Sequence, residues 1–351
     1  MGKTIYNNGV SPAVPYLSGT TIVSPAISSA TIVSPTISSA NIDSSNSSLI
    51  NYNGTANIFV VMSNGSTNAA SSTDGITWIV RTMPAALYWR SVGYGNNTFV
   101  AVAHYSATAA TSTNGLVWTA RTMPSDQEWL GVAYGNNTFI AIGRQSAVAA
   151  SSTDGITWTA RTLPANRVWR SSSFGNSTFV AVSSSSTTAA SSTDGATWTT
   201  RTMPSASSWR GLAYGNNVFV AVGYGSSNAA SSTDGITWTA RTLPTNSYWS
   251  ETAYGNGIFV AIATGYNSRE AASSTDGITW TARTLPVSQG FFTTIKYGNN
   301  VFVATSQSTT RAATSEDGFT WTLRSLPTTS EVWVASGFGN PIVSTKEIRS
   351  I

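Results

Sequence analysis

Short runs that alternate hydrophobic and polar residues recur through most of the chain, and each run is bounded by Gly, Asn, Asp or Pro. Residues 169–208 show the pattern: WRSSSFGNSTFVAVSSSSTTAASSTDGATWTTRTMPSASS. A two-residue period rich in β-branched and aromatic residues indicates strands, and no 3.6-residue helical period is visible. The segment therefore predicts four short strands, at 169–175, 178–182, 187–192 and 196–202.

One octapeptide, SSTDGITW, marks the repeat. It stands at 71–78, 151–158, 231–238 and 273–280, and related sequences stand at 111–118, 191–198 and 314–321. Successive copies begin 40, 40, 40, 40, 42 and 41 residues apart. Four antiparallel strands in a unit of this length, repeated along a chain, are typical of a β-propeller. We therefore expect an all-β fold: a seven-bladed β-propeller with four-stranded blades, preceded by an extended β-structured stalk.

The strand order at the two ends of the repeat array predicts how the ring closes. The array opens with second-strand sequence, NIFVVM at 57–62, and ends with first-strand sequence, VWVASGFG at 332–339. Pairing the last first strand with the opening strands would complete one blade and remove an open sheet edge. PIVST at 341–345 reads as one more strand, which we expect to pair outside the ring or to end as a tail.

The octapeptide resembles the Asp-box, Ser-x-Asp-x-Gly-x-Thr-Trp, of sialidases and many unrelated propellers. In that family the box is a hairpin brace on the face opposite the active site, so the resemblance implies a fold and leaves the function open. The residue types agree, because Asp-Gly forms tight turns, Asp and Ser side chains bond turn amides, and Trp buries a large ring. The residues assigned this structural role are Asp74, Trp78, Asn114, Trp118, Asp154, Trp158, Asp194, Trp198, Asp234, Trp238, Asp276, Trp280, Asp317 and Trp321.

An arginine recurs a few residues after each octapeptide, in WTART or a variant of it. A charge that appears once per blade predicts a cross-strand or blade-to-blade partner, and the alternative is a basic ring that binds an anion. The residues are Arg81, Arg121, Arg161, Arg201, Arg241, Arg283 and Arg324.

The connections between second and third strands and between blades vary freely, whereas the other two turns are uniform. Both variable connections lie on one face of a propeller, and a rigid scaffold with variable loops on one rim is typical of a binding surface. Aromatic rings beside amides and hydroxyls suit sugar rings or a protein surface. Neutral drift of exposed loops is the alternative. The candidate ligand-binding residues are Tyr88, His104, Tyr105, Asp126, Glu128, Arg144, Arg167, Tyr224, Tyr248, Tyr266 and Arg269.

Composition narrows the chemistry further. Only 9% of the residues are charged and the net charge is +4, which is weak evidence for a nucleic-acid partner. The chain has no cysteine, and its single histidine, His104, has no neighbouring metal ligands in the sequence. We therefore expect no metal, no cofactor, no nucleic-acid partner and no membrane insertion. The opening residues lack the apolar run of a signal peptide, which predicts synthesis in a cytoplasm.

A glycoside hydrolase is the enzymatic alternative to a binding protein. Glycoside hydrolysis normally needs two positioned carboxyl groups, or a tyrosine nucleophile with a carboxyl partner. Glu251 is the first suspect, because it stands on an innermost strand where the sister copies have Ser, Gly, Ala or Thr. Arg90, Arg170 and Arg210 recur at one first-strand position and imitate part of an arginine cluster. The Arg-Ile-Pro segment of sialidases is absent, and we expect no catalytic activity.

The first fifty residues follow a different rule. TIVSPAISSA at 21–30 is followed by TIVSPTISSA at 31–40, so that Ile recurs at every fifth position. A single ribbon cannot bury these side chains alone, whereas three copies wound together could. The spacing therefore predicts a trimerising stalk, and a disordered Ser/Thr/Pro linker is the alternative. The pentad residues are Ile22, Ile27, Ile32, Ile37 and Ile42, with Leu17 one step earlier.

Together the parts resemble a tailed-phage fibre or head-decoration protein. The expected division is an N-terminal anchor at 1–16, the stalk at 17–47 and the propeller at 48–351. The resemblance implies a homotrimer on the virion surface, made in the host cytoplasm and attached to a capsid or tail protein by its N-terminal segment. The outward propeller would bind host surface polysaccharide or glycoprotein, and three copies would raise avidity. A decoration protein without a ligand is the alternative.

Overall fold

The computed structural model describes residues 57–265, 268–287, 291–307, 310–327 and 332–341, and the backbone of four short strands outside or at the edge of these ranges. The described elements are strands. The chain divides into one compact unit at 57–341 and another made of 1–56 with 342–351.

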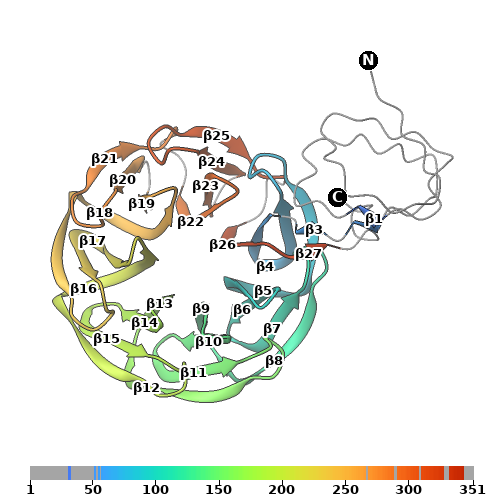
Figure 1. Cartoon of the computed structure of the whole chain (residues 1–351), viewed down its shortest axis with the longest axis horizontal. Coiled ribbons are helices and arrows are strands. Elements are labelled where there is room, and N and C mark those ends of the chain that lie inside the picture. The colour runs from blue at the N-terminus through green and yellow to red at the C-terminus, as the bar shows by residue number, and fades with distance from the viewer. Residues whose placement is uncertain are drawn as a thin grey trace, which may run out of the picture. The chain divides into compact units, whose positions relative to one another are not determined.

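Four consecutive strands from each repeat form an antiparallel sheet, and the sheets are arranged around a central axis (Figure 1). First strands such as β9 and β13 lie nearest the axis, and fourth strands such as β12 and β25 lie at the rim. Some strands run on through the connection between repeats and take part in two sheets. The strands up to the fourth repeat are β4 (Ile58–Ser72), β5 (Ile79–Gly95), β6 (Thr98–His104), β7 (Ser106–Ser112), β8 (Thr119–Gln127), β9 (Trp129–Gly135), β10 (Thr138–Gly143), β11 (Ser146–Ser152), β12 (Thr159–Arg167), β13 (Trp169–Gly175), β14 (Thr178–Ser183) and β15 (Ser186–Ser192).

The second half of the array continues the same meander. Its strands are β16 (Thr199–Gly215), β17 (Val218–Ser232), β18 (Thr239–Gly255), β19 (Ile258–Ala263), β20 (Glu270–Ser274), β21 (Thr281–Thr284), β22 (Phe292–Gly298), β23 (Val301–Ser306), β24 (Arg311–Ser315), β25 (Thr322–Ser325) and β26 (Trp333–Gly339). The last of these, β26, pairs antiparallel with β4, with Phe338 opposite Phe59. This pairing confirms the closure that the strand order predicts.

The fourth strand of each repeat begins later than expected. In the fourth repeat it begins at Thr199, not at Ala196. The Asp194 side chain is the reason, because its Oδ1 accepts hydrogen bonds from the amides of Ala196 and Thr197, both at 2.8 Å. Those amides are therefore held in the turn and are not available to the neighbouring strand.

The serine and the aspartate of the octapeptide turns bond groups of the same turn. In the fourth repeat the Ser192 hydroxyl donates to Asp194 and accepts from the Gly195 amide, both at 2.9 Å. Gly195 has a φ of 70°, a left-handed conformation that favours glycine. Asn114 accepts the equivalent bonds from Leu116 and Val117. The carboxylate oxygens and the Asn114 oxygen therefore hold hairpins together.

The arginine after each octapeptide has a cross-strand partner in the same sheet. Arg201 donates through Nε to the Ser191 hydroxyl at 2.8 Å, and Arg241 donates in the same way to Ser231 at 2.9 Å. These contacts confirm the cross-strand expectation for both residues.

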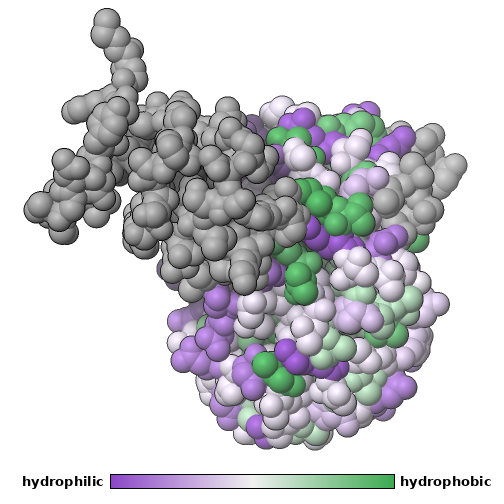
Figure 2. Space-filling view, turned by 90° about the vertical axis from the view of Figure 1, so that its right-hand side faces the viewer, coloured by the Kyte–Doolittle hydropathy of each residue, from purple (hydrophilic) through white to green (hydrophobic). Residues whose placement is uncertain are grey.

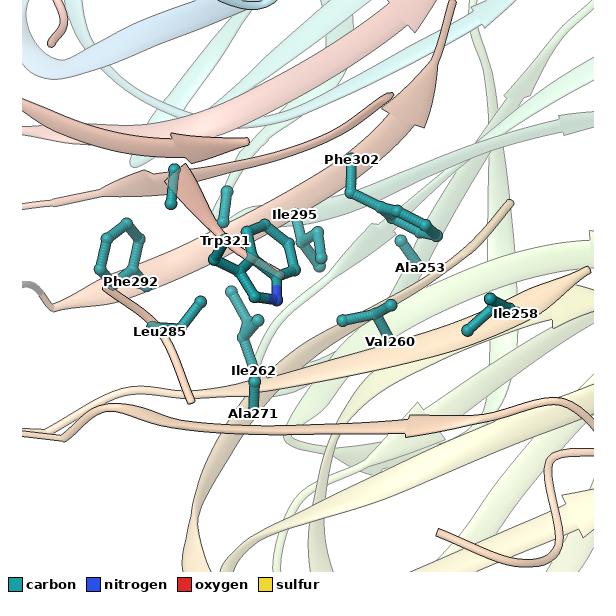
Figure 3. Packing of buried hydrophobic residues seen from close by; sticks show 12 residues of the cluster. Ala253, Ile258, Val260, Ile262, Ala271, Leu285, Phe292, Ile295, Phe302 and Trp321 are labelled. Atoms are coloured by element: carbon teal, nitrogen blue, oxygen red, sulfur yellow. The ribbon is translucent and has the colours of Figure 1, made fainter. Parts of the chain in front are cut away.

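Neighbouring sheets pack through the octapeptide tryptophan. Trp321 is 8% exposed and belongs to one cluster with Val260 and Ile262 of β19 and with Phe292 and Ile295 of β22. Figure 3 shows these side chains between the two sheets. Burial of a ring of this size is among the larger stabilising contributions in a core, which explains why the tryptophan recurs.

A second contact links the sheets in a cycle. The glycine that ends each first strand leaves room for an aromatic ring of the next sheet, and a Cβ there would overlap that ring. The pairs are Gly95 with Tyr134, Gly135 with Phe174, Gly175 with Tyr214, Gly215 with Tyr254, Gly255 with Tyr297, Gly298 with Phe338 and Gly339 with Tyr94. The last pair returns to the first sheet, so the cycle is closed.

Four short strands of the smaller unit are described. β1 (Thr31–Ile32) pairs parallel with β2 (Asn51–Tyr52). β27 (Ile342–Val343), from the PIVST segment, pairs antiparallel with β3 (Gly54–Thr55), so segments from both ends of the chain join in one ribbon. Apart from β1, the predicted anchor and stalk lie outside the described residues.

The surface matches the composition. Figure 2 shows a side of the propeller on which pale, intermediate residues predominate and strongly hydrophobic or hydrophilic groups are scattered. This appearance follows from the many Ser, Thr, Ala and Gly residues and the few charges.

Candidate functional site

The two ends of the sheets differ in chemistry. Because consecutive strands are antiparallel, the first-to-second and third-to-fourth turns share one end, which we call the brace face. There the side-chain amide of Asn136 donates to the Thr193 carbonyl of the next sheet at 2.9 Å. Asn299 does the same to Thr73, across the closure of the ring. The opposite end, the variable face, carries the connections around residues 64, 86, 105, 126, 145, 166, 185, 206, 225, 246, 265, 287 and 307.

One aromatic cluster on the variable face contains three of the predicted site residues. Tyr88 pairs across the strands with His104. The Tyr105 ring meets the Tyr88 ring edge-on at 6.5 Å between centroids and the His104 ring at 5.5 Å. Tyr88 is 50% exposed and Tyr105 is 64% exposed, which leaves two rings open to a ligand.

The sequence suggested that His104 is an exposed rim residue, and the structure places it elsewhere. Its side chain is buried, and burial together with repulsion from Arg90 lowers its pKa to about 4. The ring is therefore neutral at pH 7. The reason for this placement is that β6 runs on to His104 and β7 begins at Ser106, so the histidine belongs to a strand and only Tyr105 forms the connection. The Tyr105 ring packs against the histidine.

An ion pair extends this cluster into the next sheet. Arg144 Nη1 lies 3.1 Å from Glu128 Oε2, and the two backbones are also hydrogen-bonded. Burial alone would raise the pKa of Glu128, but a hydrogen bond from the Tyr105 hydroxyl and the charge of Arg144 outweigh it and lower that pKa. Five predicted residues from two sheets thus lie in one cluster.

A second aromatic cluster lies on the same face. Tyr224 and Tyr248 are directly opposite each other on paired strands, with ring centroids 5.0 Å apart. The Arg210 guanidinium carbon lies 4.5 Å from the centroid of the Tyr224 ring, a cation–π geometry. Tyr248 is 53% exposed.

The remaining candidate ligand-binding residues lie outside the two clusters or at their edge. Arg269 donates to the Leu285 carbonyl at 2.9 Å and, with Tyr248 and Glu270, lines a hollow of ≈ 450 Å³. Arg167 donates to Thr188 at 3.3 Å beside a different hollow of ≈ 510 Å³. Asp126 is exposed near the end of β8. Tyr266 lies outside the described residues.

Three arginines that were not included among the predicted site residues belong to the same region. Arg90, Arg170 and Arg210 each follow the buried tryptophan of a first strand, at a position where the strand register shifts. Burial and repulsion from Arg210 and Arg144 lower the pKa of both Arg90 and Arg170, the latter to about 10. The sequence signal that could have identified these arginines is their recurrence directly after a tryptophan.

Glu251 is half-buried on the first-strand part of β18. Burial raises its pKa, and the charges of Lys296 and Arg210 oppose the rise. The charged groups that act on this carboxyl in the described residues are thus cations, and a second carboxyl is not among them.

Within the described residues, groups of His, Asp and Glu that could hold a metal ion do not occur. Among the same residues, a helix long and apolar enough to cross a membrane is also absent.

Comparison with known proteins identifies the fold. A virginiamycin B lyase from Staphylococcus aureus superposes with a TM-score of 0.64 at 13% identity, covering 71% of this chain and 88% of the lyase. YCF48 from Cyanidioschyzon merolae gives a TM-score of 0.54 at 14% identity, with coverages of 71% and 88%. The computationally designed protein Ika8 gives 0.56 at 13% identity, with coverages of 81% and 94%. This chain has a β-propeller fold. Neither a family model nor a curated protein matches its sequence.

Proposed function

We propose that this propeller is the glycan-binding head of a non-enzymatic virion structural protein, such as a phage fibre. The observation that carries the binding role is the pair of exposed tyrosine clusters on the variable face, Tyr88 with Tyr105 and Tyr224 with Tyr248. In the octapeptide of the fourth repeat, by contrast, the Ser192 hydroxyl and Asp194 Oδ1 already bond groups of their own turn on the brace face.

Tyrosine faces suit sugar rings because a pyranose presents C–H groups on one side and hydroxyls around its edge. In both clusters the rings stand beside groups that can bond such hydroxyls. Glu128 and Arg144 lie next to Tyr105, and Ser247 with Glu270 lies next to Tyr248. Each cluster therefore combines an apolar platform with polar partners.

The finer architecture belongs to the same proposal. The octapeptides are Asp-boxes, the ring has seven blades, and residues 17–47 form a trimerising stalk. The closed cycle of glycine–aromatic contacts supports one blade for each octapeptide. Mass photometry of the full chain tests the stalk, and a monomeric mass would contradict it.

A glycan array with purified protein tests the binding role. We expect a defined set of surface glycans to bind, and we expect Tyr105→Ala with Tyr248→Ala to abolish binding. The matched control is Ile156→Ala with Ile236→Ala, which removes two exposed hydrophobic side chains from the brace face. Absence of any glycan ligand would exclude glycan binding and favour a decoration protein. The same loss in the control would show that the tyrosine clusters are not the binding site.

One observation supports a glycan hydrolase as the second candidate. Glu251 is a half-buried carboxyl with a raised pKa on a strand near the axis, which is typical of a general acid. Release of reducing sugar from a bound glycan, abolished by Glu251→Gln, would establish this activity.

A further inference from the structure

The position after the first-strand tryptophan is a β-bulge. Strand pairing shifts register between Trp89 and Ser91, and equivalent shifts occur in the other sheets. A bulge leaves one residue outside the ladder and re-aims its side chain. The bulge residues are Arg90, Leu130, Arg170, Arg210, Ser250, Thr293 and Val334.

The arginines at these bulges converge. Arg90 stands in the sheet of β6 and Arg210 in the sheet of β17, and two other sheets, those of β9 and β13, lie between them in the chain order. Arg90 and Arg210 nevertheless repel each other, and Arg170 feels the same repulsion from Arg210. First strands such as β13, which carries Arg170, lie nearest the common axis (Figure 1).

This cluster has more positive charge than its surroundings balance. Glu128 acts on both Arg90 and Arg170, and it already pairs with Arg144. Glu251, on which Arg210 acts, is also acted on by Lys296. The buried Nε atoms of Arg90 and Arg170 have no hydrogen-bond partner among the described residues. Like charges that are removed from water, together with N–H donors that have no acceptor, favour the binding of an anion.

The fold itself does not need a cation at this position. Leu130 occupies the equivalent bulge in the neighbouring sheet, and its strand pairs in the same way. The arginines at the three bulges that carry them therefore serve a purpose other than strand pairing. The guanidinium group matches carboxylate and phosphate oxygens through two parallel hydrogen bonds.

We propose that Arg90, Arg170 and Arg210 bind the oxyanion substituent, carboxylate or phosphate, of an acidic surface glycan. The inference rests on the proposed glycan-binding function and assigns its ligand class. Because Arg210 stacks on Tyr224, the anion would lie beside the second aromatic cluster, which can hold the sugar ring. A saccharide with one acidic substituent satisfies both parts of this arrangement.

Calorimetric titration with three sugars of the same ring tests the proposal: glucose, glucuronate and glucose 6-phosphate. We expect at least one of the two anions to bind about tenfold more tightly than glucose, with an affinity that falls as salt rises. Comparison of glucuronate with glucose 6-phosphate identifies whether the site binds a carboxylate or a phosphate. Equal affinity for the three sugars, or no binding of either anion, would overturn the proposal.

The variant Arg90→Leu with Arg210→Leu should remove the preference, and it introduces the residue that the chain itself carries at position 130. The matched control, Arg161→Leu with Arg241→Leu, removes the same charge from fourth strands and should keep the preference. An unchanged preference in the first variant would overturn the proposal, and a cooperative thermal melting transition that is not lowered in that variant shows that unfolding is not the cause of a loss.

The two proposals can fail separately. Neutral glycans on the array with no anion preference would leave the binding role intact and remove the arginine site. Binding of glucuronate at the arginines, with no glycan bound on the array, would leave the arginine site intact and remove the glycan-binding role.

Discussion

The aromatic ring of Tyr94 lies against the Cα atom of Gly339, so that a residue near the start of the repeat array packs on one near its end. The contact lies beside the pairing of β26 with β4. Closure of the ring thus depends on side-chain packing as well as on backbone hydrogen bonds.

Substituting Gly339→Ala should destabilise the propeller. The added Cβ would overlap the Tyr94 ring and approach Phe99, and overpacking of this kind costs roughly 1–3 kcal/mol of the free energy of unfolding. Urea denaturation measures the change. Gly265→Ala is the control, because a Cβ there meets Ser268 and Tyr248 at 3.5 Å, an ordinary contact. Equal effects of the two substitutions would contradict the packing argument.

The Asp194 carboxylate should contribute pH-dependent stability. Hydrogen bonds from the amides of Thr197 and Ala196 lower its pKa to about 2, below its ordinary value of 3.8. A lowered folded-state pKa gives stability that is present above pH 4 and is lost as the pH falls toward 2. Solvent screening of this exposed group limits the contribution to about 1 kcal/mol.

Asp194→Asn should fold and lose this pH dependence, since Asn114 already occupies the same turn position in another repeat. Asp194→Ala should cost roughly 1–2 kcal/mol more, because it leaves two turn amides without their acceptor. Thermal denaturation between pH 2 and pH 7 measures both variants. Equal stability of the Ala and Asn variants would show that the carboxylate is not a brace.

His104 should titrate near pH 4, and its NMR signal is unambiguous because the chain has one histidine. Its folded-state pKa lies below the ordinary 6.5, so the unfolded chain binds more protons and stability falls as the pH drops from about 6.5 to 4. The loss should be about 2–3 kcal/mol at most. In Arg90→Leu the pKa should rise and stay below 6.5, because burial remains. An unchanged pKa in that variant would show that Arg90 does not act on the ring.

Replacing Arg90 and Arg210 together with leucine should stabilise the fold. The substitution removes mutual repulsion and a buried unpaired Nε, so the free energy of unfolding should rise by roughly 1 kcal/mol. Replacing Arg161 and Arg241 should lower it by a similar amount, because each loses a hydrogen bond to a serine. Destabilisation by the first pair would mean that these arginines support the fold.

Much of the fold follows from local sequence. The runs at 169–175 and 178–182 become β13 and β14 with boundaries within one residue of those expected. The start of the fourth strand was missed, because a side-chain hydrogen bond from Asp194 decides it and strand propensity does not register such bonds.

The candidate site was harder to anticipate. Sequence variation pointed to the connections of the variable face, yet it grouped the buried His104 with the exposed Tyr105 without distinguishing them. It also could not show that Arg90 and Arg210 interact, since they are far apart in the chain and in sheets that are not neighbours.

The sequence by itself determined the repeat, the order of strands, the turn chemistry of the octapeptides and the pairing that closes the ring. These properties depend on neighbours in the chain and on a regular spacing, which the letters show directly. The tertiary structure alone decided which side chains that are distant in the chain meet: the ring of Tyr94 on Gly339, the tyrosine pairs, and the interacting arginines. The physical reason is that charge repulsion and burial depend on distances across the ring, and only the closed ring sets those distances.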